Sequence, residues 1–213
     1  MGGFYGLLQL FVLPVLASIF NTYLLHWPNW GLQFVVFAAN FLCSVIIFHR
    51  FLIDSWDSTL DAPGKTLRSA AWGLLVYYGG TVAVSLLILL LRPDYVNLNN
   101  NSVAQLAKDG QGLMFLAIVF LVPVAEELLF RGILFRWVYD CSPILAWACS
   151  VGCFAAVHVV SYIGQYDLTL CLLATLQYLP SGIALCFAYQ RSETIIAPIL
   201  MHIIINFLAF LAI

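Results

Sequence analysis

Seven stretches of this chain are apolar and long enough to cross a lipid bilayer as helices, and no other feature restricts its fold more. Inside a bilayer, backbone N–H and C=O groups have no water to bind, so a spanning segment must be a helix or part of a closed barrel. A spanning helix needs about 20 apolar residues, whereas a barrel strand needs about 10. The stretches have helix length: they cover residues 4–25, 31–48, 70–91, 113–135, 143–163, 168–189 and 194–213. We therefore predict an all-α, polytopic transmembrane helical bundle of about seven spans.

The composition leads to the same class of protein. Hydrophobic residues make up 63% of the chain and charged residues 8%, whereas a soluble domain is typically about 25% charged. The formal net charge is −2 and the sequence contains no basic patch, which argues against a nucleic-acid partner. We expect an integral, multi-pass membrane protein whose surroundings are lipid.

The chain reads as a single membrane domain, 1–213, because no polar break is long enough for a soluble domain. Residues 1–112 supply three predicted spans without a recognisable motif, and residues 113–213 supply four spans that carry the candidate chemistry. The polar stretches 49–69 and 92–112 are interpreted as loops between spans.

The first apolar stretch is predicted to be a retained helix, because no basic residue precedes it and no clear cleavage site follows. Cytoplasmic loops of membrane proteins carry an excess of Lys and Arg. Seven spans place six cations on the side of the N-terminus, namely Arg50, Lys65, Arg68, Arg131, Arg136 and Arg191, against Arg92 and Lys108 on the other. We predict a cytoplasmic N-terminus and, since no eukaryotic targeting signal is evident, a bacterial plasma membrane.

Two adjacent glutamates, Glu126 and Glu127, lie inside the fourth apolar stretch. A carboxylate at the centre of a bilayer costs about 2.5–3.5 kcal/mol, so the pair predicts a polar intramembrane cavity. Glu127 and Arg131 are four residues apart and can form an ion pair on one helix face. The other carboxylate can then stay free to act as a general base. The alternative interpretation is an ion-pair cluster that only fixes helix packing.

Two later spans carry the remaining polar candidates. Phe154 and His158 share one helix face by their four-residue spacing, and so do His202 and Asn206. If all three spans face one water-filled cavity, the hydrogen-bonding needs of these buried polar groups are met together. Pro123 precedes Glu126 by three residues and is predicted to free the carbonyl four residues before itself.

Two chemistries fit this set of residues. Without a metal, one glutamate and His158 bind and deprotonate a water, while His202 and the Asn206 amide donate hydrogen bonds to the oxyanion. With a metal, His158, His202 and a glutamate such as Glu126 ligate Zn²⁺. The HExxH zinc helix is absent, and Asn is a better oxyanion donor than zinc ligand. We favour the chemistry without a cofactor, and zinc stays the alternative.

The three motifs, in this order, resemble the CPBP family of intramembrane proteases, also called the CAAX-protease and bacteriocin-processing (Abi) family. The family pattern of EExxxR, FxxxH and HxxxN or HxxxD is similar to Glu126-Glu127…Arg131, Phe154…His158 and His202…Asn206. The similarity covers about residues 113–210 and implies an endopeptidase built into a helical bundle. Family members cleave prenylated CAAX proteins, or process or confer immunity to bacteriocins and pheromones.

By this resemblance each motif residue receives a role. Glu126 is the general base, His158 helps to hold the water, and His202 and Asn206 form the oxyanion hole. The supporting residues are Glu127, Arg131 and Phe154. The expected partner is a membrane-associated peptide substrate. Two other functions stay open: a non-catalytic self-immunity or scaffold protein, and a proton-coupled transporter that uses the same carboxylates and histidines.

Overall fold

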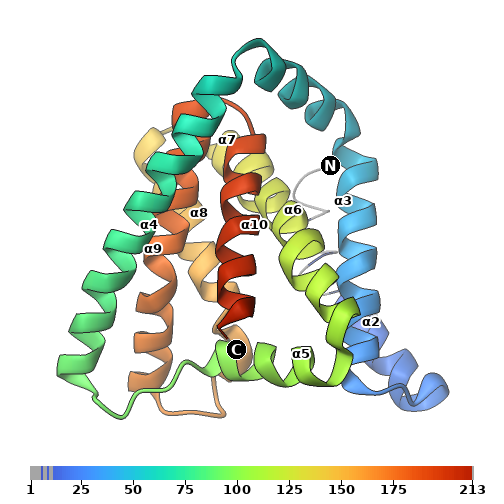
Figure 1. The fold of residues 1–213 in the computed structure, drawn as a ribbon. Coiled ribbons are helices and arrows are strands. Elements are labelled where there is room, and N and C mark those ends of the chain that lie inside the picture. Colours follow the sequence, from blue (N-terminus) through green and yellow to red (C-terminus); the bar gives the residue numbers. More distant parts are fainter. Residues whose placement is uncertain (1–5, 7–8, 10–11, 213) are drawn as a thin grey trace.

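The computed structural model describes residues 6, 9 and 12–212, and its elements are helices (Figure 1). Helix α2 and the π-helical segment η2 form one short helix, and η3, α6, η4 and α7 continue α5 without a break. The bounds are α2 Leu13–Phe20, η2 Asn21–Leu25, α3 Asn29–Asp61, α4 Pro63–Leu91, α5 Leu98–Leu116, η3 Ala117–Leu121, α6 Val122–Glu127, η4 Leu128–Phe135, α7 Arg136–Tyr139, α8 Pro143–Val157, η5 Val160–Tyr162, α9 Leu168–Ser192 and α10 Ile196–Leu211. The predicted all-α fold is confirmed.

The long helices α3 and α4 meet at one end of the molecule and diverge towards the other (Figure 1). The helices of the C-terminal half fill the space between them. Helix α9 packs along α4 and α8, α10 packs on α4 and α9, and α6 packs on α3. The first part of α5 lies across the open end, at a steep angle to the other helices (Figure 1).

The predicted spans coincide with apolar helices, but they differ in length. Four helices of the described chain are long and apolar enough to cross a membrane: Asn29–Asp61, Pro63–Leu91, Leu98–Tyr139 and Leu168–Ser192. Three shorter apolar helices, Leu13–Leu25, Pro143–Val157 and Ile196–Leu211, correspond to the other predicted spans. Part of the predicted first span, 4–25, lies outside the described residues.

Both polar stretches that were interpreted as loops contain helix, so that interpretation was wrong. Helix α3 continues to Asp61, bends at Phe48 (φ −105°, ψ 17°) and crosses the end of the bundle. A drop in hydropathy marks the point where a helix leaves the lipid. The helix itself can continue beyond that point, because its backbone hydrogen bonds do not depend on lipid. Stretch 92–112 contains most of α5, which begins where the Asn97 side chain accepts a hydrogen bond from the backbone N–H of Asn100 (3.0 Å).

Helix α5 turns sharply at Gln111, whose backbone angles (φ 41°, ψ −123°) are not helical. On one side of this residue Gly110 is buried, and a Cβ there would clash with the Met114 side chain and lie 3.1 Å from Trp30. The turn separates the crosswise part of α5 from the part that runs into the bundle towards α6 (Figure 1).

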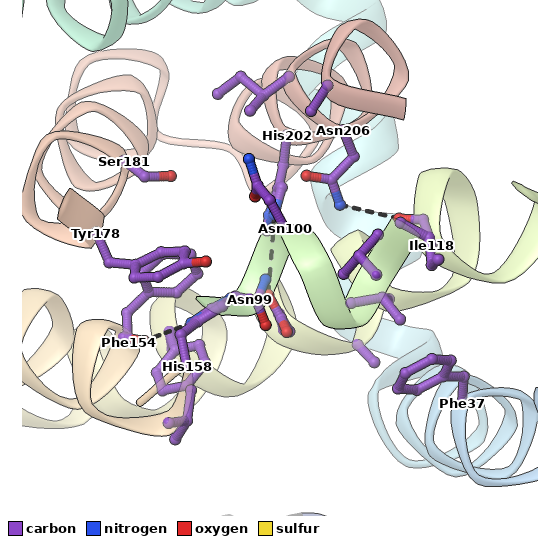
Figure 2. A pocket seen from close by; sticks show the side chains of 18 of the residues that line it. Phe37, Asn99, Asn100, Ile118, Phe154, His158, Tyr178, Ser181, His202 and Asn206 are labelled. Atoms are coloured by element: carbon purple, nitrogen blue, oxygen red, sulfur yellow. Dashed lines mark hydrogen bonds and ion pairs between the residues drawn. The ribbon is translucent and has the colours of Figure 1, made fainter. Parts of the chain in front are cut away.

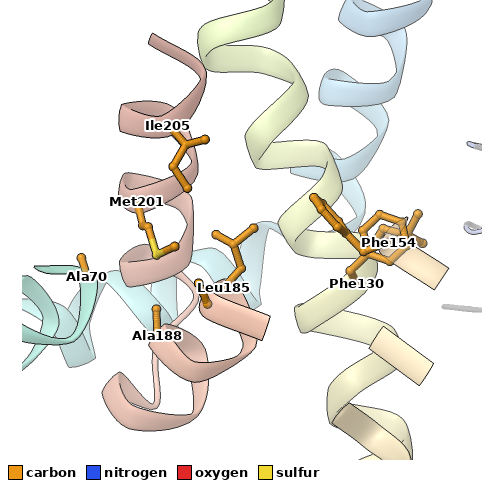
Figure 3. Packing of buried hydrophobic residues seen from close by; sticks show 9 residues of the cluster. Ala70, Phe130, Phe154, Leu185, Ala188, Met201 and Ile205 are labelled. Atoms are coloured by element: carbon orange, nitrogen blue, oxygen red, sulfur yellow. The ribbon is translucent and has the colours of Figure 1, made fainter. Parts of the chain in front are cut away.

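The apolar core lies between α4, η4, α8, α9 and α10 (Figure 3). Phe130 and Phe154 pack edge to face with ring centroids 5.4 Å apart. Small residues where α4 meets α9, such as Ala70 and Ala188, let the helix backbones approach closely. Gly73 on α4 belongs to this contact, since a Cβ there would lie 2.5 Å from Met201 Sδ and 3.2 Å from Ala188 Cβ.

Gly73→Leu is expected to separate α4 from α9 and to lower the free energy of unfolding by about 1–3 kcal/mol, the usual cost of overpacking. Gly79→Leu on the same helix is the matched control, because nothing lies within 4 Å of a Cβ there. Denaturation of the two variants in detergent, followed by circular dichroism, measures the difference. Equal stability of the two variants would contradict this packing.

Candidate active site

The two glutamates lie on α6, a short α-helical segment between the π-helical segments η3 and η4. Glu127 and Arg131 have no solvent exposure, and Arg131 Nη1 donates to Glu127 Oε1 over 2.9 Å. Arg131 Nη2 also donates to the backbone carbonyl of Gly182 on α9 (3.1 Å). The guanidinium carbon lies 4.7 Å from the ring centroid of Phe154. The predicted ion pair is present, and the hydrogen bond from Arg131 to Gly182 ties η4 to α9.

Glu127 has a second partner on α10. Nδ1 of His202 lies 2.8 Å from Glu127 Oε1, at hydrogen-bond distance. Because an ionised carboxylate can only accept, the ring nitrogen that faces it carries the proton. Nε2 of His202 faces the other glutamate, 3.8 Å from Glu126 Oε2. One oxygen of Glu127 therefore holds both Arg131 and His202.

Glu126 lies in a different environment. Its side chain is 18% exposed, against 0% for Glu127, and it lines a cavity. Its Oε2 atom is buried and accepts no hydrogen bond, as is also true of Oε2 of Glu127. Because the Glu126 side chain is partly exposed and lines the cavity, its carboxylate is available to a water molecule or a ligand.

His158 ends α8, and Nδ1 of its ring lies 2.8 Å from the backbone carbonyl of Phe154. A carbonyl accepts, so Nδ1 carries the proton, and Nε2 of a neutral ring is left as an acceptor. The ring stacks on Tyr178 of α9, with centroids 4.3 Å apart and planes at 22°. The backbone and Tyr178 together fix both the tautomer and the orientation of His158.

Asn206 Nδ2 donates to the backbone carbonyl of Ile118 (2.9 Å), and Pro123 explains why that carbonyl is available. In η3 the hydrogen bonds span five residues, as from the Val122 N–H to the Ala117 carbonyl. The next bond in this register would run from residue 123 to Ile118, but proline has no N–H. The prediction placed the freed carbonyl one residue later, at Val119, because it assumed an α-helix.

One cavity of about 560 Å³ brings together Glu126, His158, His202 and Asn206. Figure 2 shows His158, at the end of α8, and His202 and Asn206 of α10 directed towards the same space. The remaining polar wall consists of amides and hydroxyls from both halves of the chain: Gln9, Gln33, Asn40, Tyr77, Thr81, Asn97, Asn99, Asn100, Ser161, Gln177, Tyr178 and Ser181. Glu127 and Arg131 lie behind this wall.

Several of these groups could not be found from the motifs. Tyr178 and Gln177 are polar residues inside an apolar stretch, and that signal was available in the sequence. The asparagines before and within the first turn of α5 belong to the polar stretch 92–112, which the sequence led us to interpret as a loop. Pro123 was a sequence signal for a freed carbonyl close to Ile118, whereas the carbonyl of Gly182 carries no sequence signal, because every residue has one.

The zinc alternative requires His158, His202 and a glutamate such as Glu126 to hold one ion. Among the residues that the structure describes, no three His, Cys, Asp or Glu side chains are placed to hold a metal ion. His158 and His202 each direct Nδ1 to another partner, a backbone carbonyl and Glu127, which leaves Nε2 of each ring free. The choice between the two chemistries therefore stays a prediction. We derive no step through a metal.

Comparison with known families supports the resemblance seen in the sequence. Residues 109–208 match the family described as type II CAAX prenyl endopeptidase Rce1-like, which confirms the predicted similarity to CPBP proteases. At the level of the family, this match supports a CAAX-type intramembrane protease. Together with the four long apolar helices it indicates an integral membrane protein. No curated protein and no solved structure matches the chain.

Arg131→Met is expected to lower the free energy of unfolding by about 3–5 kcal/mol, because it leaves the charge of Glu127 buried without its main partner. The double variant Glu127→Gln/Arg131→Met removes that charge and is expected to recover most of the loss. Chemical denaturation in detergent measures both.

Lys65→Ala is the matched control, because it breaks the exposed ion pair with Glu193 and is expected to leave stability unchanged. If Arg131→Met were as stable as Lys65→Ala, the buried pair would not hold the bundle together.

Proposed function

We propose that this protein is an endopeptidase that hydrolyses a peptide bond of a membrane-associated peptide, of the CAAX type or the bacteriocin and pheromone type, with water activated by Glu126. The observation that carries the proposal is the contrast between neighbouring carboxylates. Glu127 is buried and bound by Arg131 and His202, whereas Glu126 is partly exposed and lines the cavity. These environments support the division of roles.

In this mechanism Glu126 and His158 hold the attacking water. Nε2 of His158 accepts one hydrogen bond, and the Glu126 carboxylate accepts the other and takes the proton as the water attacks the peptide carbonyl. Tyr178 positions the His158 ring by stacking. When the tetrahedral intermediate collapses and the peptide C–N bond breaks, the proton passes from Glu126 to the leaving amine.

The oxyanion forms next to Asn206 and His202. An amide nitrogen carries two hydrogens, so Asn206 can hold the Ile118 carbonyl with one and donate the other to the oxyanion. In its doubly protonated form the His202 ring donates from Nε2 to the oxyanion while Nδ1 donates to the Glu127 carboxylate. Glu127, held by Arg131, therefore acts by positioning His202.

Glu126→Gln is expected to reduce cleavage at least about 100-fold, since it removes the general base and keeps the shape of the side chain. The assay uses detergent-solubilised protein with two quenched fluorescent peptides, one a prenylated peptide with a CAAX terminus and one an unprenylated membrane-inserting peptide. Glu193→Gln, at an exposed glutamate outside the cavity, is expected to cleave at the wild-type rate. Full cleavage by Glu126→Gln, or folded wild-type protein that cleaves neither peptide, would contradict the proposal.

The same assay separates the two chemistries. Thorough treatment with a zinc chelator is expected to leave the cleavage rate unchanged. A loss of cleavage that added Zn²⁺ restores would overturn the mechanism without a metal while leaving the peptidase function in place.

A further inference from the structure

Two buried polar side chains of the cavity wall take no part in the proposed reaction. They are Ser181 on α9 and Gln9, which precedes α2. Both are more than nine-tenths buried, with 8% and 6% of their surface exposed. Neither belongs to the three motifs, and Gln9 lies outside the residues 109–208 that match the family. The motif chemistry therefore does not explain why a hydroxyl and a carboxamide line the cavity at these positions.

Each of the two side chains has a polar atom without a protein partner. Gln9 Oε1 is buried and accepts no hydrogen bond. The Ser181 hydroxyl makes no hydrogen bond to any residue that the structure describes, and Figure 2 shows it directed from α9 into the cavity. Ser44 and Ser150, which are also buried, donate to backbone carbonyls. Buried polar groups are almost always hydrogen-bonded, so these two atoms are open to a group that enters the cavity.

The charge of the wall restricts which chemical group these two side chains can bind. Among the described residues that line the cavity, none is Lys or Arg, and Glu126 is the one carboxylate. A buried anion needs a partner of opposite charge, which this wall does not provide. A hydroxyl and a carboxamide both donate and accept, and therefore suit a neutral group that does the same. The peptide bond is such a group, with an N–H donor and a C=O acceptor.

A peptide that enters the cavity loses the water bound to its backbone, and leaving a buried N–H or C=O unpaired is costly. In the proposed mechanism the four motif residues of the cavity are occupied by the attacking water and the oxyanion. The backbone groups beside the scissile bond therefore need other partners.

We propose that Ser181 and Gln9 are substrate-binding residues that hydrogen-bond the main chain of the peptide beside the scissile bond. This inference rests on the proposed peptidase function and adds how that function selects its substrate. Because main-chain groups are the same in nearly every residue, Ser181 and Gln9 hold an extended segment in place without selecting its side chains.

Substitutions in the substrate backbone test these hydrogen bonds directly. In dye-labelled forms of the two assay peptides, the peptide bonds around the scissile bond are replaced one at a time by esters, which lack the N–H donor. Dissociation constants are measured by fluorescence anisotropy on the Glu126→Gln protein in detergent, which leaves the peptides intact. The cleavage parameters kcat and KM are measured in parallel on protein that retains Glu126.

Ser181→Ala and Gln9→Met are each expected to weaken peptide binding about 3- to 10-fold, the usual loss for one neutral hydrogen bond. KM is expected to rise by the same factor with kcat unchanged. For each variant, one ester that weakens binding to the parent protein is expected to have no further effect, because its partner is already missing. Ser44→Ala is the matched control: it removes a buried hydroxyl outside the cavity wall and is expected to bind every peptide as the parent does.

The ester profile separates a bound backbone from a side chain that only shapes the wall. Weaker binding by a variant whose ester profile matches that of the parent would overturn the proposal, and so would unchanged binding. Each variant is decisive for its own residue, and Ser181→Thr, which keeps the hydroxyl, is expected to keep the parent profile.

The two measurements also separate this inference from the proposed function. Cleavage by the wild-type protein without the expected ester effect would remove the main-chain site and leave the peptidase function intact. The expected ester effect on binding, without cleavage of either peptide by the wild-type protein, would remove the peptidase function and leave the main-chain site. Absence of binding of both peptides would overturn the inference.

Discussion

Glu127 carries a negative charge that is fully excluded from solvent, and the geometry of the site depends on how that charge is compensated. Its partners come from two different elements, Arg131 on η4 and His202 on α10, and Arg131 reaches the carbonyl of Gly182 on α9. A buried ion is tolerated only with partners in good geometry. Compensation of one charge therefore fixes three helices relative to one another and leaves the adjacent carboxylate, Glu126, facing the cavity.

A second constraint acts on the backbone. Pro123 interrupts the hydrogen bonds of η3 and leaves the Ile118 carbonyl without a helical donor, and Asn206 supplies one. His202 and Asn206, one turn apart on α10, thus each compensate a buried group of the Glu126 helix. His202 and Asn206, which are proposed to stabilise the oxyanion, are held in place by a buried charge and by a carbonyl that lacks its helical N–H donor. These two features distinguish the helix of Glu126 from an ordinary membrane span.

The sequence was sufficient to predict the all-α bundle and the face-sharing of Glu127 with Arg131, because apolar length and four-residue spacing are local properties. It could not predict that helix α3 runs on through the polar stretch 49–61, since polarity there reports exposure and not helix termination. The one-residue shift of the freed carbonyl depends on the π-helical register, which spacing does not show. The stack of Tyr178 on His158 depends on how α9 approaches α8. The domain division, the residue roles and the bacterial membrane stay predictions.

The central claim is that neighbouring glutamates have separate tasks, Glu127 in holding the bundle and Glu126 in the reaction. Measuring the thermal midpoint and the single-turnover cleavage rate on the same preparations of Glu126→Gln and Glu127→Gln tests it most directly. Glu126→Gln is expected to keep the wild-type midpoint and lose cleavage, while Glu127→Gln lowers the midpoint through its weakened bonds to Arg131 and His202. A Glu127→Gln protein with wild-type stability, or a Glu126→Gln protein with wild-type cleavage, would contradict the account.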